Sequence, residues 1–247
     1  MVHAFFASPG PLVFAHRGGA ALAPENTLAA FAQAVALGAD GIELDVRPSM
    51  DGRVVVHHDE TLDRTTRLHG SVNRASAAEL ARADVPELAA VLRACPGVRV
   101  IVEIKVNEPE FGRLVVEELR KANAVERACV GGFRGAVLRA VRDEEKSLAT
   151  SAAREEVRLA LYRSWLHWPV TRPSYAGYQV PERSGTTRVV SKQFIRDAHR
   201  AGLGVQVWTV NDEADARRLL DWGVDALITD RPDLMVPLVR ALALARD

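Results

Sequence analysis

The chain has 247 residues, of which 48% are hydrophobic and 26% charged, so it can bury a substantial core and is not disordered. Its 32 Lys and Arg residues are balanced by 32 Asp and Glu residues, whereas general nucleic-acid binders and proteins that bind anionic membranes usually carry a basic surplus. We therefore expect no nucleic acid among its partners, and no stable membrane insertion, because no apolar stretch approaches the roughly 18 residues of a membrane helix.

The N-terminal segment lacks the pattern of a secretory signal. No Lys or Arg precedes Arg17, and Pro9-Gly10-Pro11 interrupts the apolar residues, whereas a signal needs a basic region followed by an unbroken apolar one. The two cysteines, Cys95 and Cys129, lie far apart and form no CxxC pair, which gives neither a disulfide framework nor a thiolate zinc site. We predict a cytoplasmic protein with reduced thiols.

Short β-rich runs alternate with helical periodicity along the chain, which is the pattern of parallel βα units. Eight strands are predicted, at Leu12–Ala15, Gly41–Val46, Val98–Ile104, Ala128–Gly131, Ser147–Ala149, Ala176–Val180, Val205–Val210 and Ala226–Thr229. Helices are predicted at Thr27–Leu37, Phe111–Ala122, Gly135–Val141, Ser191–Ala201 and Asp212–Trp222. The order and the length predict an α/β fold, a (β/α)8 TIM barrel that forms a single domain over residues 1–247.

One segment interrupts the alternation. After the second strand, the turn signal Asp51-Gly52 precedes Arg53–His57, which has the pattern of an extra strand. Residues 59–86 then carry no strong signal except for a short helix near Ala75–Arg82, so we expect a short insertion at about residues 51–86 in the loop after strand two. The fifth and sixth strands are the least clearly marked, because Ser164–Ser184 mixes tryptophan, proline and glycine without a period.

Two carboxylates share one face of the second predicted strand. Side chains alternate along a strand, so Glu43 and Asp45 point one way while Ile42, Leu44 and Val46 point the other. Buried acids are costly unless a cation or basic side chains compensate them. The alternative is an exposed edge strand with solvated acids, but the apolar residues of the other face favour a buried strand.

The third strand repeats this arrangement with Glu103 and Lys105, at the end of a strongly apolar run. Active sites of (β/α)8 barrels lie at the C-terminal ends of the strands. With Glu43 and Asp45, the three carboxylates form a set of hard oxygen ligands that suits Mg²⁺ or Ca²⁺ rather than zinc. The alternative is that Glu103 and Lys105 form only an ion pair inside the barrel.

Histidines lie close to these acids in the predicted fold. His16 directly follows the first strand, and His57-His58 closes the extra strand. Two histidines at strand ends beside a carboxylate cluster suit a general acid/base pair. Arg17 and Lys105 suit a phosphate, because the guanidinium fork matches phosphate oxygens and lysine adds a point charge.

Together these segments resemble the glycerophosphodiester phosphodiesterase family, in the expected order from position 16 to 232. The matching motifs are His16-Arg17-Gly18, Pro24-Glu25-Asn26-Thr27, Gly38-Ala39-Asp40-Gly41-Ile42-Glu43-Leu44-Asp45-Val46, Asp51-Gly52, His58-Asp59, Leu62-Asp63-Arg64-Thr65-Thr66, Gly70, Glu103-Ile104-Lys105, Val207-Trp208-Thr209-Val210-Asn211 and Thr229-Asp230-Arg231-Pro232.

The resemblance implies a (β/α)8 barrel that uses a divalent metal to hydrolyse glycerophosphodiesters to sn-glycerol 3-phosphate and an alcohol. It implies that His16 and His58 are the acid/base pair. It also implies that Glu43, Asp45 and Glu103 are the metal ligands, where the metal would neutralise charge on the phosphate oxygens.

The resemblance implies binding roles for further residues. Arg17 and Lys105 would contact the phosphate, and Trp208 would line the alcohol side of the pocket. Glu25 and Asn26 would support the site, with Glu25 beside the first histidine or the metal.

Two departures from the family pattern concern the substrate rather than the catalytic set. The insertion after the second strand is short and poor in aromatic residues, and Ser164–Ser184 carries Trp165 and Trp168 without a family motif. Two other functions compete. A phospholipase C-like or sphingomyelinase D-like enzyme acting on intact lipids would need an exposed apolar motif or a basic surplus, and we expect neither. A non-catalytic barrel that binds a phosphorylated ligand would have lost a histidine or a carboxylate of the set, and all are present.

Overall fold

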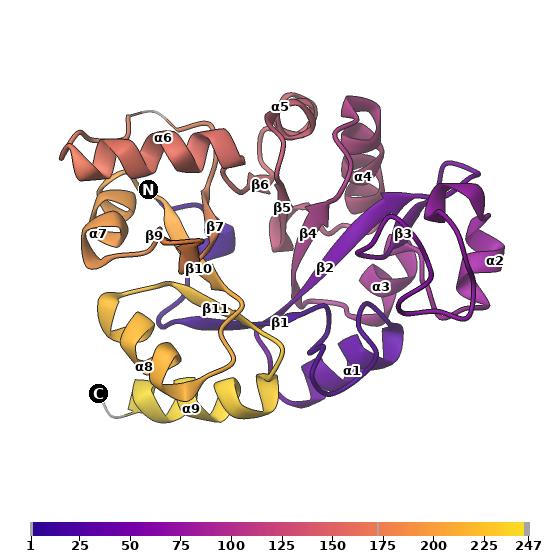
Figure 1. Ribbon diagram of the computed structural model, residues 1–247, viewed down its shortest axis with the longest axis horizontal. Helices are drawn as coiled ribbons and strands as arrows, with labels where there is room; N and C mark the ends of the chain where they lie inside the picture. The colour runs from indigo at the N-terminus through magenta and orange to yellow at the C-terminus, as the bar shows by residue number, and fades with distance from the viewer. Residues whose placement is uncertain (1, 172, 245–247) are drawn as a thin grey trace.

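The computed structural model describes residues 2–171 and 173–244, and it shows the predicted barrel (Figure 1). Eight parallel strands follow one another in the order β6-β5-β4-β2-β1-β11-β10-β7. A parallel bridge between Ser151 and Gly177 joins β6 to β7. Backbone hydrogen bonds from Ala152 N to Gly177 O and from Ala176 N to Thr150 O, of 2.9 and 2.8 Å, support this contact, so the barrel is nearly closed.

The barrel strands agree with the prediction apart from their ends. They are β1 (Leu12–His16), β2 (Gly41–Pro48), β4 (Arg99–Ile104), β5 (Ala128–Gly132), β6 (Ala149–Thr150), β7 (Gly177–Pro181), β10 (Gly204–Trp208) and β11 (Ala226–Thr229). The fifth predicted strand began too early, because Ser147 is held in a turn by hydrogen bonds from its backbone N and Oγ to Glu145 Oε1. The apolar strand runs are buried on both faces, as parallel sheets require.

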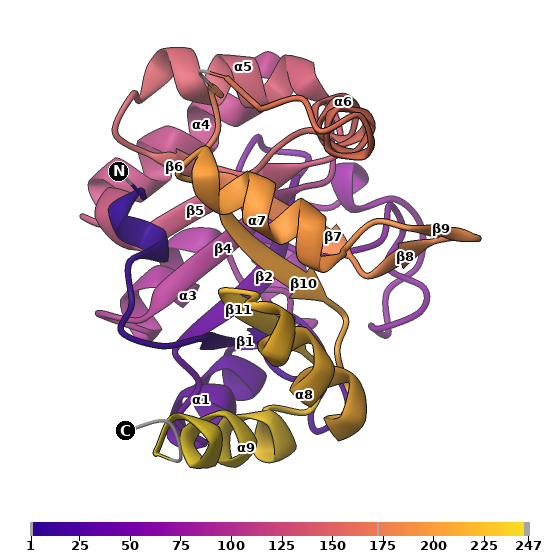
Figure 2. The same ribbon diagram turned by 90° about the vertical axis from the view of Figure 1, so that its left-hand side faces the viewer.

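The helices cover the outside of the barrel (Figures 1 and 2). The five predicted helices are present as α1 (Leu28–Ala36), α4 (Pro109–Lys121), α5 (Gly135–Glu144), α7 (Lys192–Arg200) and α8 (Glu213–Trp222). Three further helices were not predicted, namely α3 (Leu88–Ala94), α6 (Arg154–Trp165) and α9 (Pro232–Leu244). Pro237 interrupts the helical pattern of α9. Helix α6 is rich in exposed charged and aromatic residues and so lacks a simple apolar stripe.

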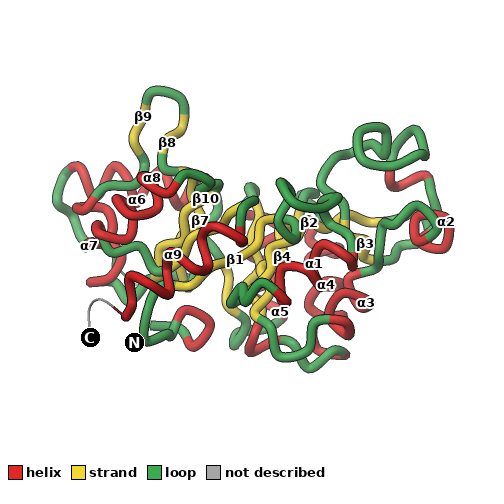
Figure 3. Tube along the Cα trace, turned by 90° about the horizontal axis from the view of Figure 1, so that it is seen from below, coloured by secondary structure: helices red, strands yellow, loops and turns green. Residues whose placement is uncertain are grey.

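The insertion after β2 is also present. Strand β3 (Val54–Val56) pairs antiparallel with β2, and α2 (Ala77–Ala81) lies within the predicted helical segment. A 3-10 helix at Val72–Arg74 precedes α2. Figures 2 and 3 show the insertion and the β8–β9 hairpin (Arg183–Ser184 and Thr187–Arg188) at the same end of the barrel.

The N-terminal segment closes the other end of the barrel. A 3-10 helix at Ala4–Phe6 buries Phe5 and Phe6 in the cluster that fills this end of the interior. A side chain at Gly204 would place its Cβ 2.3 Å from the Phe6 ring, so only glycine fits there. The outer core consists of the apolar layers between the strands and the helices. None of the described helices combines the length and the apolar composition of a membrane span.

Candidate active site

The site begins at a tight turn after β1. Arg17, Gly18 and Gly19 all have left-handed backbone conformations, with φ of 52°, 86° and 91°, which glycine adopts without strain. A Cβ at Gly18 would lie 2.7 Å from the Ala30 Cβ, so α1 also excludes a side chain there. The turn directs the backbone N of Arg17 to Glu43, to which it donates a hydrogen bond of 3.1 Å.

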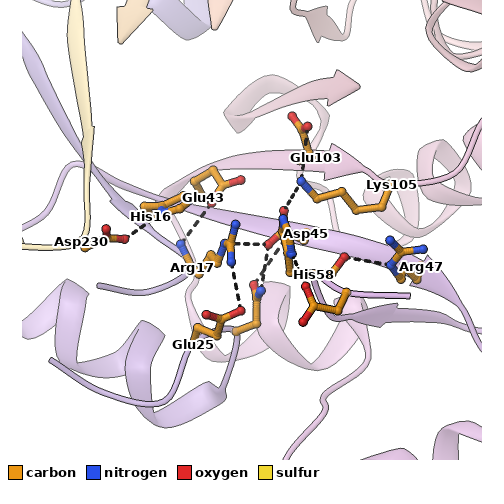
Figure 4. A network of polar contacts seen from close by, with 12 residues as sticks. His16, Arg17, Glu25, Glu43, Asp45, Arg47, His58, Glu103, Lys105 and Asp230 are labelled. Carbon is orange, nitrogen blue, oxygen red and sulfur yellow. Dashed lines mark hydrogen bonds and ion pairs between the residues drawn. The ribbon is translucent and has the colours of Figure 1, made fainter. Parts of the chain in front are cut away.

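His16 lies at the mouth of the barrel, between strands β11 and β2. Its Nδ1 is 2.7 Å from Asp230 Oδ1, and its Nε2 is 3.9 Å from Glu43 Oε2. Asn211 donates a 2.8 Å hydrogen bond to the other oxygen of Asp230 and thereby fixes this carboxylate. Figure 4 shows Asp230 and Glu43 on opposite sides of the imidazole.

Asp230 received no role in the sequence analysis, although its motif contributed to the resemblance. The closure of the predicted barrel could have identified Asp230. The last strand pairs with the first, with Ala15 opposite Thr229, so the next residue of each strand is also brought together. Those two residues are His16 and Asp230.

The predicted carboxylates point into the mouth from β2 and β4. Pairing places His16 beside Glu43 and Asp45 beside Glu103. Glu43 and Asp45 are only 6% and 1% exposed, so the buried-strand interpretation is correct and the exposed-edge alternative is wrong. Gly131 on β5 makes room for Glu103, because a Cβ there would lie 2.8 Å from Glu103 Oε2.

Basic side chains compensate Asp45 (Figure 4). Lys105 Nζ is 2.8 Å from Asp45 Oδ1, and Arg17 Nε is 3.2 Å from Asp45 Oδ2. Asn26 Nδ2 donates a 2.9 Å hydrogen bond to Asp45 Oδ2, whereas Thr27, its neighbour, caps α1. Lys105 also lies 3.5 Å from Glu103 Oε1, so it stands between two of the predicted metal ligands.

The carboxylates at the mouth of the barrel differ in how far nearby positive charge offsets their burial. Burial opposes ionisation of Asp45, but Lys105 and Arg17 outweigh it and lower its pKa. Burial raises the pKa of Glu43, and the nearby Asp45 raises it further. Burial also raises the pKa of Glu103, which Lys105 only partly counteracts. The positive charge around buried Glu43 and half-buried Glu103 therefore does not offset the loss of water around their ionised forms.

The shortage of positive charge around Glu43 and Glu103 provides a structural test of the predicted metal site. Three carboxylates supply oxygen donors only, and a divalent cation beside Glu43 and Glu103 would favour their ionised forms. The donor set thus fits Mg²⁺ or Ca²⁺ by its chemistry. As they stand, no three His, Cys, Asp or Glu side chains within residues 2–171 and 173–244 are grouped as a metal-binding cluster.

His58 enters the mouth from the insertion. Its Nδ1 is 2.6 Å from Asp59 Oδ1, and Arg47 Nε donates a 2.9 Å hydrogen bond to its backbone oxygen. His57 points away from the mouth: it is 4% exposed, and its Nε2 lies 3.0 Å from Thr61 O within the insertion. The two neighbouring histidines therefore serve different parts of the molecule.

The two predicted acid/base histidines have opposite pKa shifts. Burial disfavours the charged form of His16, but the hydrogen bond to Asp230 and the charge of Glu43 outweigh it and raise its pKa. For His58, burial dominates over the neighbouring Asp45 and lowers the pKa.

Glu25 supports the site through arginines. Its Oε1 accepts a 3.1 Å hydrogen bond from Arg17 Nη1, and Arg64 donates to both of its oxygens at 2.7 and 2.9 Å. Arg64 also donates a 2.6 Å hydrogen bond to Asp59. A continuous chain of ion pairs and hydrogen bonds thus links Arg17 on the first turn to His58 on the insertion. Sequence reasoning gave Arg64 and Asp59 no role. Arg64 reaches Glu25 from a loop distant in sequence, whereas both partners of Asp59, His58 and Arg64, are local.

Trp208 lies at the end of β10, half-buried, and lines a cavity of about 450 Å³ that also contains Glu103. This cavity continues from the mouth of the barrel along α6. The expectation of no exposed apolar motif is wrong for this region. Large apolar side chains on and after α6 are exposed, namely those of Leu159, Tyr162, Trp165, Leu166 and Trp168. An exposed apolar surface therefore exists where the sequence analysis expected none.

The residues predicted to form the site lie at the C-terminal ends of the strands or in the loops that follow them. Comparisons with known proteins identify the family. The model of the glycerophosphoryl diester phosphodiesterase family matches residues 16–234. A glycerophosphodiester phosphodiesterase of Caldanaerobacter subterraneus is 30% identical over 93% of this chain and 98% of its own length. A probable glycerophosphodiester phosphodiesterase of Mycobacterium tuberculosis is 33% identical over 94% of this chain and 91% of its own.

A solved structure is also similar. It is an Oleispira antarctica phosphodiesterase in complex with the product sn-glycerol-3-phosphate, with a TM-score of 0.76 and 25% identity, and the match covers 94% of this chain and 97% of that one. The family match, the similarity over nearly the full length and the shared barrel lead to one conclusion: this chain belongs to the glycerophosphoryl diester phosphodiesterase family, whose members are phosphoric diester hydrolases.

Proposed function

We propose that this protein hydrolyses glycerophosphodiesters to sn-glycerol 3-phosphate and an alcohol, with His16 and His58 as its acid/base pair. The observation that carries the proposal is the matched geometry of the two histidines. Each has a carboxylate within 2.7 Å of Nδ1, Asp230 for His16 and Asp59 for His58. This leaves both Nε2 atoms for proton transfer, as pairs of catalytic histidines require.

In the proposed reaction, one histidine takes a proton from the nucleophile, either water or the 2-hydroxyl of the glycerol, as its oxygen bonds to phosphorus. If the 2-hydroxyl attacks, the product is a cyclic phosphate, which a water molecule then opens. The bond between phosphorus and the alcohol oxygen breaks, and the other histidine gives that oxygen a proton. Arg17 and Lys105 would bind the phosphate oxygens. Glu43, Asp45 and Glu103 would hold a divalent cation, Mg²⁺ or Ca²⁺, which would neutralise charge on those oxygens.

A panel of substrates tests this function. Glycerophosphocholine, -ethanolamine, -glycerol and -inositol are incubated with the protein in Mg²⁺, in Ca²⁺ and in EDTA, and sn-glycerol 3-phosphate is measured. We expect its release from at least one diester in the presence of a metal. Release of phosphocholine instead would place the cleaved bond on the other side of the phosphorus. Binding of every diester without turnover would favour a non-catalytic barrel.

Asp230 is proposed as the residue that positions His16. Asp230→Asn removes the charge that favours the protonated imidazole, so the pKa of His16 should fall toward its ordinary value or below. We expect kcat to fall at least about tenfold with little change in KM. The limb of the pH–rate profile that His16 governs should move to lower pH, because protonation is lost earlier as the pH rises.

The matched variant Asp230→Glu keeps the charge and should recover part of the activity. A merely structural Asp230 would give a different result: both variants would lower the melting temperature, and the pH–rate profile of the remaining activity would not move.

A further inference from the structure

One arginine of the insertion joins two loops that carry parts of the proposed site. Arg64 lies in the loop that follows His58, and all three nitrogens of its guanidinium donate hydrogen bonds. Nη1 and Nη2 donate to the two oxygens of Glu25 at 2.9 and 2.7 Å, and Nε donates to Asp59 Oδ2 at 2.6 Å. We call Arg64 with these two carboxylates the Arg64 clamp. It connects the loop after β1 to the insertion.

The Arg64 clamp differs from an ordinary surface ion pair. A single exposed pair contributes little, whereas a two-point contact with a carboxylate that belongs to a larger network holds its partners in one geometry. The side chain of Arg64 is 50% exposed, but that of Glu25 is only 14% exposed. Burial opposes ionisation of Glu25, but Arg64 and Arg17 outweigh it and lower its pKa. The hydrogen bond from Arg64 also lowers the pKa of Asp59, so both carboxylates stay charged.

Each carboxylate of the clamp holds one residue of the proposed site with its other contact. Asp59 Oδ1 lies 2.6 Å from Nδ1 of His58. Glu25 Oε1 accepts a 3.1 Å hydrogen bond from Nη1 of Arg17. Because Arg64 binds the remaining oxygen of Asp59 and both oxygens of Glu25, it fixes how each carboxylate is oriented. Arg64 is thus one step removed from an acid/base histidine and from a phosphate ligand.

The clamp is also the polar connection between the two loops. Within the part of the chain that the structure describes, the hydrogen bonds and ion pairs from residues 59–71 to residues 17–27 all come from Arg64. The other hydrogen bonds of residues 59–71 stay within the insertion. Loss of Arg64 would therefore free the loop that orients His58 from the loop that carries Arg17.

We propose that Arg64 is a positioning residue for the reaction, because its clamp keeps His58 and Arg17 in a fixed arrangement across the mouth of the barrel. The inference rests on the proposed function and adds to it a residue that would touch neither the substrate nor the metal. A displacement of about 1 Å at a reacting group can lower a rate about 10²-fold, so a contact outside the reaction site can control kcat. Lysine could not replace this arginine, since it lacks the planar fork that reaches three oxygens at once.

Substitution of Arg64 tests the proposal, with a matched control in the same loop. Arg64→Met should lower kcat about 10- to 100-fold through His58 and raise KM through Arg17. Arg64→Lys keeps the charge and should recover only a small part of the loss. The control is Arg67, which is exposed and makes no ion pair or hydrogen bond with the described residues. Arg67→Met should leave both kinetic parameters unchanged.

Double variants show whether Arg64 acts through its two partners. If it does, Arg64→Met should add little further loss of kcat to Asp59→Asn, and little further rise of KM to Glu25→Gln. A merely structural Arg64 would instead give a lower melting temperature and losses that multiply in both double variants. Multiplied losses would overturn the proposal, and so would wild-type kinetics of Arg64→Lys, which would show that the charge alone suffices.

Hydrogen exchange separates this inference from the proposed function, because it needs no substrate. Amides of residues 17–27 and 57–71 should exchange faster in Arg64→Met than in the wild type or in Arg67→Met. Faster exchange in both loops supports the clamp even if no diester is hydrolysed, and unchanged exchange contradicts it. Hydrolysis by Arg64→Met with wild-type kcat and KM would contradict the positioning role, whatever the exchange shows, and leave the proposed function intact.

Discussion

Replacing either His16 or His58 by alanine is expected to lower kcat by about 10²- to 10⁴-fold, because each would supply one proton transfer of the reaction. Both variants should fold, since each side chain lies at the mouth rather than in the apolar core (Figure 4). The measurement is steady-state kinetics on the best substrate of the panel, with circular dichroism as the check on folding. A variant that keeps more than about a tenth of the activity would remove that histidine from the acid/base pair.

His57 provides the matched control, because it lies next to His58 in sequence but points into the insertion. His57→Ala should leave kcat within a few-fold of the wild type. It should destabilise the insertion by about 1–3 kcal/mol, since Thr61 O loses the imidazole that lies 3.0 Å from it. If His57→Ala is inactive and His58→Ala is active, the assignment of the two histidines is reversed.

Removal of divalent metal is expected to abolish hydrolysis, and Mg²⁺ or Ca²⁺ should restore it. Glu43→Gln and Glu103→Gln should each weaken metal binding, because each removes a negative oxygen ligand. The measurement is calorimetric titration of the metal into each variant, with activity assayed after exhaustive chelation. Full activity in EDTA would contradict the assignment of these carboxylates as metal ligands.

Lys105→Met is the control for the metal ligands. Lys105 lies 2.8 Å from Asp45 and 3.5 Å from Glu103 and would compete with a bound cation for both acids. Its removal should impair turnover or substrate binding while metal affinity stays nearly the same or rises. If Lys105→Met loses metal as severely as Glu103→Gln, Lys105 is a structural ion-pair partner and not a phosphate ligand.

The strands and the inward carboxylates could be predicted because they depend on local patterns. Alternation along β2 is enough to place Glu43 and Asp45 on one face, and the structure has both acids in the mouth. The order of strands and helices then leads to a barrel, whose strand ends collect the predicted side chains. Glu25 came only from the resemblance, and the structure places it against Arg17 rather than beside His16.

What escaped prediction depends on distant contacts. Asp230 reaches His16 only because the last strand pairs with the first, and Arg64 reaches Glu25 only because the insertion folds over the mouth. Helix α6 lacks a clear apolar stripe, because Tyr162 and Trp165 lie on its exposed side. The cavity that these two residues line follows from the placement of α6 against the β8–β9 hairpin, which no local pattern reveals.

The most direct test of the proposed function is a ³¹P NMR spectrum of glycerophosphocholine incubated with the protein and Mg²⁺ or Ca²⁺. The site described here predicts that the diester signal is replaced by that of sn-glycerol 3-phosphate with the wild type, and that it persists in EDTA and with the His16→Ala/His58→Ala variant. A diester signal that persists with the wild type in both metals would contradict hydrolysis of this diester, and equal conversion by the double variant would contradict this site as its source.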